Sequence, residues 1–335
     1  MSRYRNKEEK KQLYKKIGIA AAVLIVGGGI TAGVLGAADG KLLSHEQTET
    51  VSNDITYNGK TYTPKGNLET YLFAGIDSPG QVEELTEYDG TGQCDVLIVL
   101  VRDRSTDECQ YVTIDRNTIT PVDSLENNGN YISTDDIQIS LAHAMSLDHT
   151  TRAENTVKAV STLLGGATID SYAMVNMSAI QVVNDMVGGV TVTIEDDFTG
   201  VDDTLKKGET ITLKGEQAEH FVRGRMTMKD DDTNQNRMAR QQQYEAGLKT
   251  AFAAKCAEDN TFPLDVYHAL EPYMTTTVSA KKFSRLALLM TDDKEDTSLQ
   301  IDGTYSIDDN DWQAFTPDPD SLQQVILTLF YEEKK

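Results

Sequence analysis

Three short apolar stretches decide the fold: residues 70–76 (TYLFAGI), 95–102 (DVLIVLVR) and 109–114 (CQYVTI). Each has the length and composition of a β-strand. In the first two, both sets of alternate residues are largely apolar, which is typical of a strand covered on both faces. Helical patterns follow at 153–164, 177–187, 215–222, 235–256, 264–271, 279–290 and 319–331. Further strands are expected at 171–175, 190–194 and 297–306. This order predicts an α/β fold, a three-layer α/β/α sandwich with a mixed central sheet.

Polar residues stand at the ends of these strands. Residues 103–108 are too few for a parallel crossover, so the second and third strands form an antiparallel hairpin. A loop centred on Ser105 and Thr106 places Asp95 across from Arg116, and antiparallel pairing of the first strand brings Asp77 to the same edge. Two interpretations remain open at this point: a reactive cluster, or one structural Asp–Arg pair beside a capping aspartate.

A second polar group surrounds the helix predicted at 235–256. Tyr244, Leu248 and Phe252 form an i, i+4 apolar stripe, and extending it backwards reaches Arg240 or Gln241 and then Arg237. Gln242, Glu245 and Lys249 are expected on the opposite side. Inward-facing arginines need anionic partners, either fixed acids such as Asp230–Asp232 or a phosphate, which guanidinium binds in two-point fashion.

The N-terminus predicts the compartment. Residues 17–38 are uncharged and, as a helix, would be about 33 Å long, enough to cross a bilayer core of about 30 Å. The first 16 residues carry a net charge of +5, which predicts that they are cytoplasmic and that the rest of the chain is extracytoplasmic. The alternative is a cleaved signal peptide, although this apolar run exceeds the usual length. We therefore expect a tail (1–16), one transmembrane helix (17–38), a stalk with a small Asn58-Gly59 hairpin (39–66) and a large extracytoplasmic domain (67–335) at the cell membrane.

Charge and cysteine usage exclude several classes of function. The 335 residues have a net charge of −22, and the part after residue 16 reaches −27, which argues against nucleic-acid binding. Cys94, Cys109 and Cys256 show no zinc-site spacing. The hairpin register also separates Cys94 from Cys109 by too great a distance for a disulfide.

Seven short motifs, in order, resemble the LytR–CpsA–Psr family over about residues 68–252. They are 75–78 (GIDS), 94–95 (CD), 113–118 (TIDRNT), 187–190 (VGGV), 213–218 (LKGEQA), 222–225 (VRGR) and 236–241 (NRMARQ). The resemblance implies a membrane-anchored phosphotransferase with a long apolar pocket for a polyprenyl tail. Its partners would be a glycopolymer on a polyprenyl-pyrophosphate carrier and peptidoglycan as acceptor, with Mg²⁺, or Mn²⁺, as cofactor.

The resemblance also assigns residues. Asp95, Asp77 and Arg116 are the expected catalytic group, with Asp77 and Asp95 as metal ligands. The expected pyrophosphate-binding residues are Arg223, Arg225, Arg237, Arg240 and Gln241. From the chemistry of activating a hydroxyl, Asp95 is the favoured general base. The oligomeric state is not predicted.

The chain departs from the family pattern at three places. Cys94 replaces an arginine, Asp115-Arg116-Asn117 replaces Pro-Arg-Asp, and Asn234 replaces an acid for which Asp232 is the nearest substitute. These departures leave two alternatives open. The first is a catalytically silent module that binds polyprenyl pyrophosphate, and the second is a membrane-anchored regulatory protein of the envelope.

Overall fold

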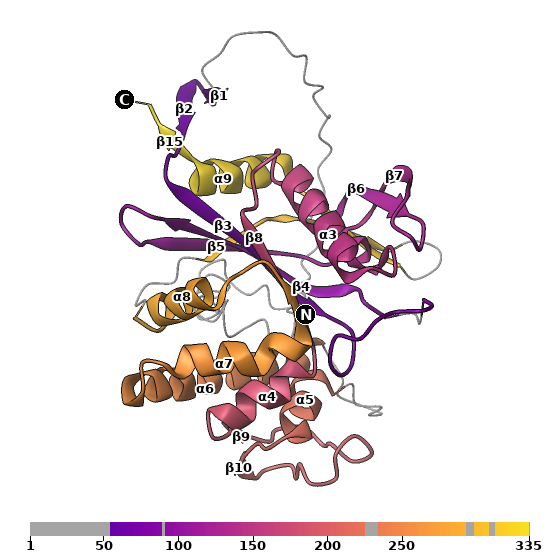
Figure 1. Ribbon diagram of the computed structural model, residues 1–335, viewed down its shortest axis with the longest axis vertical. Coiled ribbons are helices and arrows are strands. Elements are labelled where there is room, and N and C mark those ends of the chain that lie inside the picture. The colour runs from indigo at the N-terminus through magenta and orange to yellow at the C-terminus, as the bar shows by residue number, and fades with distance from the viewer. Residues whose placement is uncertain (1–53, 89–90, 225–233, 293–297, 308–311, 335) are drawn as a thin grey trace, which may run out of the picture.

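The computed structural model describes residues 54–88, 91–224, 234–292, 298–307 and 312–334. Its centre is a six-stranded mixed sheet in the order β11-β8-β3-β4-β5-β12 (Figure 1). The strands are β3 (Leu68–Ile76), β4 (Cys94–Asp103), β5 (Cys109–Ile114), β8 (Ser171–Asn176), β11 (Met274–Thr276) and β12 (Ser298–Gln300). β3, β4 and β5 pair antiparallel, whereas β8 runs parallel to β3 and β12 runs parallel to β5. The mixed sheet predicted from the apolar stretches is confirmed.

Helices cover both faces of this sheet, as the alternation of apolar residues requires. One set of alternate strand residues, including Tyr71, Phe73 and Ile98, packs under the helices of one face. These helices are α4 (Ala179–Met186), α5 (Glu216–Arg223), α6 (Asn234–Glu258), α7 (Phe262–Leu270) and α8 (Ala280–Asp292). A short hairpin of β9 (Thr191–Thr193) and β10 (Thr210–Thr212) lies beside them, and the turn η2 (Glu271–Tyr273) follows α7.

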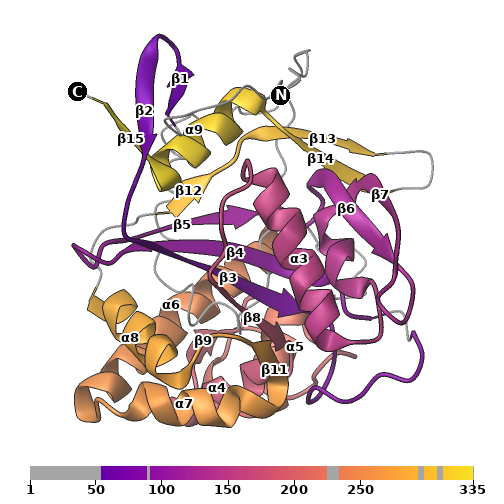
Figure 2. The same ribbon diagram turned by 45° about the horizontal axis from the view of Figure 1, so that its top comes forward.

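The other set of alternate residues, including Leu72, Leu97 and Val99, packs on the opposite face. That face is covered by the 3₁₀ helix η1 (Ile139–Ala144), α3 (His149–Leu163) and α9 (Pro319–Phe330). Two hairpins complete it, one of β6 (Ile119–Leu125) and β7 (Tyr131–Gln138), the other of β13 (Gly303–Ile307) and β14 (Gln313–Pro317). Figure 2 shows the two hairpins on the same side of the molecule as α3.

The predicted Asn58-Gly59 hairpin is present as β1 (Ile55–Tyr57) and β2 (Lys60–Pro64). Asn58 and Gly59 have φ values of 48° and 76°, as a two-residue hairpin turn requires. β2 also pairs with β15 (Tyr331–Glu333), so the two ends of the described chain form one small sheet beside α9 (Figure 1). This part of the expected stalk therefore packs with the C-terminus of the folded domain.

Sequence periodicity located the helices well and the short strands poorly. All seven predicted helices are present, each within about four residues of its expected ends. The strand expected at 297–306 is instead two strands in different sheets, β12 and β13. The strands β6, β7, β10, β11, β14 and β15 were not predicted, because they are short or rich in polar residues and have no continuous apolar run.

The predicted membrane segment 17–38 and tail 1–16 lie outside the described residues. Within the part of the chain that the structure describes, no helix is both long and apolar enough to cross a membrane.

Candidate active site

The end of the sheet where β3 and β5 stop and β4 starts, here called the site edge, brings Asp95 and Arg116 together. Leu97 faces Ile114 in the β4–β5 ladder, so the predicted register is confirmed. Beyond the last ladder pair, Arg116 Nη1 donates to Asp95 Oδ1, and Arg116 Nη2 donates to Gln93 Oε1 at 2.8 Å. The two side chains of the ion pair remain 26% and 23% exposed, so a ligand has access to both.

Asp77 lies at the same edge, because its N–H donates to the carbonyl of Gln93 at 2.9 Å. Its carboxylate pairs with Arg223, the last residue of α5, with 2.5 Å between Nη2 and Oδ1. The other nitrogen, Nη1, donates to Glu219 Oε1 at 2.8 Å. Gln93 therefore links two Asp–Arg pairs, one between residues 21 positions apart in the sequence and one between residues 146 positions apart.

Residues that the sequence analysis missed also shape the site edge. Glu219 is one helical turn before Arg223, a spacing that could have drawn attention to it. Gln93 and Asn176, which ends the neighbouring strand β8 and donates to the carbonyl of Gly80, carried no such signal. Their places depend on strand order, which sequence spacing does not reveal.

Arg240 points inward, as the helical phase predicts, but it contacts protein rather than the open site edge. It is 3% exposed and pairs with Asp196. Its Nε and Nη2 donate to the carbonyls of Phe221 and Gly224, at 3.1 and 2.7 Å. A cation at the last carbonyls of α5 stabilises the end of that helix. The described contacts thus make Arg240 a residue that holds Arg223 in place, and the acid described beside it is Asp196; Asp230–Asp232 lie outside the described residues.

Gln241 follows Arg240 and is 4% exposed. Its Nε2 donates weakly to the carbonyl of Val222 at 3.5 Å, and within the described part of the chain its Oε1 has no hydrogen-bond partner. A buried amide oxygen without a donor is costly, so this atom is suited to accept one from a ligand.

The remaining predicted residues are described only in part. Arg225 and Asp232 lie outside the described residues, and of Arg237 and Asn234 only the helical backbone is described. Glu245, expected on the outer side of α6, is instead 7% exposed. That expectation was wrong because α6 packs against α5, α8 and β9, and so has more than one buried side.

Two of the departures from the family pattern, Cys94 and the segment Asp115-Arg116-Asn117, lie among the described residues. Cys94 is buried, and burial raises the pKa of its thiol to about 12, so it is neutral at physiological pH. Cys94, Cys109 and Cys256 are all free thiols. Asp115 accepts hydrogen bonds from Tyr305 Oη and the Asn117 N–H, and burial raises its pKa. These contacts fasten the β13–β14 hairpin beside Arg116.

Behind the site edge, His143 and Arg152 hold the segment that leads into β4. His143 is buried and its Nδ1 donates to the carbonyl of Gly92 at 2.8 Å; burial lowers the pKa of its imidazole to about 3. Gly92 has φ +93°, and a Cβ there would lie 2.4 Å from Arg152 Nη1. A larger residue at position 92 would therefore be strained by the positive φ and would crowd the buried guanidinium of Arg152.

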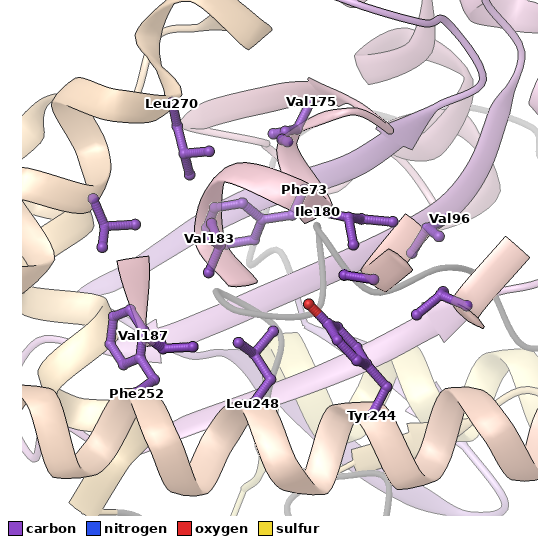
Figure 3. Close-up of a cluster of buried hydrophobic side chains, with 14 of the residues drawn as sticks. Phe73, Val96, Val175, Ile180, Val183, Val187, Tyr244, Leu248, Phe252 and Leu270 are labelled. Carbon is purple, nitrogen blue, oxygen red and sulfur yellow. The ribbon is translucent and has the colours of Figure 1, made fainter. Parts of the chain in front are cut away.

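An apolar cluster borders the site edge on the face of α4 to α8. Figure 3 shows side chains from the sheet (Phe73, Val96) and from α6 (Tyr244, Leu248) pointing toward a common centre. Val96 follows Asp95, and Val222 precedes Arg223, so the charged and apolar surfaces adjoin. The arrangement places accessible cations directly beside a closely packed apolar core.

The site edge offers a donor set that fits Mg²⁺ or Mn²⁺ bound together with a substrate. Asp77 and Asp95 supply hard carboxylate oxygens, and Mg²⁺ commonly takes one or two carboxylates and completes its coordination with phosphate oxygens and water. Among the described residues no group of three or more His, Cys, Asp or Glu side chains is positioned for a metal. Among the described residues, Asp77 and Asp95 are therefore the two carboxylates that would hold such an ion.

Comparison with known proteins agrees with the family resemblance of the sequence motifs. A model of the LytR_cpsA_psr family matches residues 37–329. A polyisoprenyl-teichoic acid–peptidoglycan teichoic acid transferase TagU from Bacillus cereus (strain AH820) is 27% identical over 315 residues, which cover 92% of this chain and 94% of that protein.

Solved structures share the fold. Bacillus subtilis TagV is 24% identical with a TM-score of 0.55, over 79% of this chain and 96% of TagV. TagT bound to LIIa-WTA is 20% identical with a TM-score of 0.51, over 79% of this chain and 90% of TagT. Protein gbs0355 from Streptococcus agalactiae is 19% identical with a TM-score of 0.58, over 78% of this chain and 86% of that one.

Proposed function

The chain belongs to the LytR–CpsA–Psr family, and from this membership we propose that it is a glycopolymer–peptidoglycan phosphotransferase. Its relative TagU bears the name of a teichoic acid transferase that uses a polyisoprenyl-linked donor. The donor proposed for this chain is a glycopolymer on a polyprenyl-pyrophosphate carrier, and the acceptor is a hydroxyl of peptidoglycan. The observation that carries the proposal is the site edge, where two half-exposed Asp–Arg pairs adjoin the apolar cluster.

The arginines bind the donor in this proposal. Guanidinium groups match phosphate oxygens in two-point geometry, and Arg116 and Arg223 both present exposed surface at the site edge. Each must exchange an aspartate oxygen for a phosphate oxygen when the donor binds. Gln241 lies beside this group, because its Nε2 donates to the carbonyl of Val222, the neighbour of Arg223.

Asp95 acts as the general base. It takes the proton of the acceptor hydroxyl, whose oxygen forms a new P–O bond to the phosphorus that carries the glycopolymer. The bond from that phosphorus to the bridging oxygen breaks, and polyprenyl monophosphate leaves with the electron pair, stabilised by the arginines. Asp77 and Asp95 would hold Mg²⁺ or Mn²⁺, which would neutralise charge on the diphosphate.

The proposed setting is the outer face of the cell membrane. The support is the apolar segment 17–38 after a basic tail, and the fact that a lipid-linked donor is confined to the membrane. The same anchor would keep the catalytic domain within reach of both donor and acceptor.

The test is transfer by the purified full chain in detergent, measured as release of polyprenyl phosphate from a polyprenyl-pyrophosphate-linked glycopolymer with peptidoglycan and Mg²⁺. Asp95→Asn should lower the rate about 10²- to 10⁴-fold. The matched control is Asp103→Asn, at the opposite end of the same strand, which should leave the rate unchanged.

Three results would change the assignment. Full activity of Asp95→Asn would remove Asp95 as the base. Donor binding without any turnover by the natural sequence would identify a silent binding module. Neither binding nor turnover would favour a regulatory protein.

A further inference from the structure

Glu219 holds Arg223 from the side away from Asp77. The guanidinium of Arg223 is shared by two carboxylates, with Nη2 on Asp77 at 2.5 Å and Nη1 on Glu219 at 2.8 Å. The two acids differ in exposure: the Asp77 side chain is 47% exposed and the Glu219 side chain only 17%. A charge pair that water screens less is the more persistent of the two.

Glu219 is itself fixed by a neighbouring helix. Its second oxygen, Oε2, accepts a hydrogen bond from Gln181 Nε2 of α4 at 2.8 Å. The residues beside it on α5, Ala218 and Phe221, are fully buried in the apolar cluster, as is Ile180 next to Gln181. The carboxylate therefore has one defined orientation, set by the packing of α4 against α5.

The two acids would behave differently when a diphosphate arrives. Asp77 is the exposed partner and one of the two residues that would hold a metal ion, so phosphate and metal both compete for its contact with Arg223. Glu219 faces Arg223 through the other nitrogen, where Gln181 completes its hydrogen bonding. The Glu219–Arg223 bond can persist while the Asp77–Arg223 bond is exchanged.

We propose that Glu219, oriented by Gln181, is a positioning residue that keeps the Arg223 guanidinium aimed at the diphosphate of the donor after Asp77 has released it. This inference rests on the proposed function, since it needs Arg223 to bind phosphate. The expected change in anion affinity is the opposite of the one that charge alone predicts. Removing a carboxylate near an anion site strengthens anion binding by simple electrostatics, whereas removing Glu219 should weaken it.

The experiment measures equilibrium binding of farnesyl pyrophosphate to the full chain in detergent with Mg²⁺, by titration calorimetry, so that no turnover is required. Glu219→Ala should weaken binding about tenfold, the size of one coupled contact. Glu219→Gln keeps the shape of the side chain and one acceptor oxygen, so its Kd should lie between those of the natural sequence and of Glu219→Ala. Gln181→Ala, which frees the second oxygen of Glu219, should weaken binding by a smaller factor.

A double-mutant cycle separates positioning from mere helix stabilisation. If Glu219 acts through Arg223, Glu219→Ala should add nothing to the loss already caused by Arg223→Ala. The matched control is Glu216→Gln, which removes an exposed acid from the first turn of the same helix and should leave Kd unchanged or slightly tighter.

The outcomes distinguish this inference from the proposed function. Unchanged or tighter binding by Glu219→Ala and Glu219→Gln, with weaker binding by Arg223→Ala, would overturn the role of Glu219 alone. Additive losses in the cycle would also overturn it. Unchanged binding by Arg223→Ala would overturn the phosphate site itself, and with it the premise.

Discussion

The two ends of the central sheet both carry arginine–carboxylate groups, but the arginine on the sheet is buried at one end, whereas the arginines at the other end are accessible. At the far end, Arg102 is 4% exposed and donates to Glu69 and to Asp107. Each of those acids has a second cation: Lys282 lies 3.6 Å from Glu69, and Arg285 Nη2 donates to Asp107 at 2.8 Å. At the site edge, Arg116 and Arg223 are 26% and 34% exposed.

The titration of the far end reflects its closed network. Burial opposes ionisation of Glu69, but the hydrogen bond from Tyr71 and the charges of Lys282 and Arg102 lower its pKa overall. The hydrogen bonds from Arg102 and then Arg285 likewise lower the pKa of Asp107. Glu69 and Asp107 each face two cations, so the network joins β3, β4 and α8. The site edge leaves its arginines accessible, which suits exchange with a ligand.

The largest effect on stability is expected at the far end of the sheet, where Arg102 is buried. Arg102→Ala should lower the free energy of unfolding by about 3 kcal/mol, because it removes the buried guanidinium that joins Glu69 to Asp107 and leaves the 16% exposed Glu69 with Lys282 as its remaining described cation. Thermal and urea unfolding of the full chain measure this change. The folded fraction should keep normal transfer activity, since the site edge lies at the other end of the strands. A small shift in melting temperature with lost activity would contradict the comparison.

A slightly smaller effect is expected from Arg240, which is buried although it lies in the half of the molecule that carries the site. Arg240→Ala should destabilise the ligand-free protein by about 2–3 kcal/mol, because it leaves Asp196 and the end of α5 without their cation. Arg240→Lys should recover only part of this stability, since an ammonium lacks the planar fork. Normal melting with lost binding of farnesyl pyrophosphate would instead make Arg240 a ligand-binding residue.

The smallest effect on stability belongs to the open end. Arg116→Ala should change the free energy of unfolding by about 1 kcal/mol or less, as for other accessible ion pairs. Transfer should nevertheless fall by about 10²- to 10³-fold, because a cation that faces the developing charge is lost. A melting shift as large as that of Arg102→Ala would show that the two ends are equivalent, and that Arg116 and Asp95 form a structural pair.

Much of the site edge could be predicted because short connections fix registers. With five residues between β4 and β5, the hairpin leaves little choice of pairing, and Asp95 faces Arg116 as expected. The helical phase of α6 likewise predicts that Arg240 and Tyr244 face inward. It could not predict that Glu245 is buried as well, because a single apolar stripe shows only one of the surfaces against which a helix packs.

The hydrogen-bond and ion-pair partners of these residues could not be predicted from loop length or helical phase. Asp196 reaches Arg240 from 44 residues away, and Tyr305 reaches Asp115 from 190 residues away. Contacts between polar side chains that are far apart in the sequence leave no periodic pattern from which they could be predicted. The same holds for Glu219, whose role depends on Gln181 of another helix.

The sequence by itself determined the layers, the antiparallel β3–β4–β5 unit and the edge at which Asp77, Asp95 and Arg116 meet. Apolar alternation and loop length are local properties, and each limits a strand to one face and one register. Only the tertiary structure decided which arginines are closed and which are open. Burial depends on how α4, α5 and α6 pack together, and that packing seals Arg240 against Asp196 while leaving Arg116 and Arg223 at the surface.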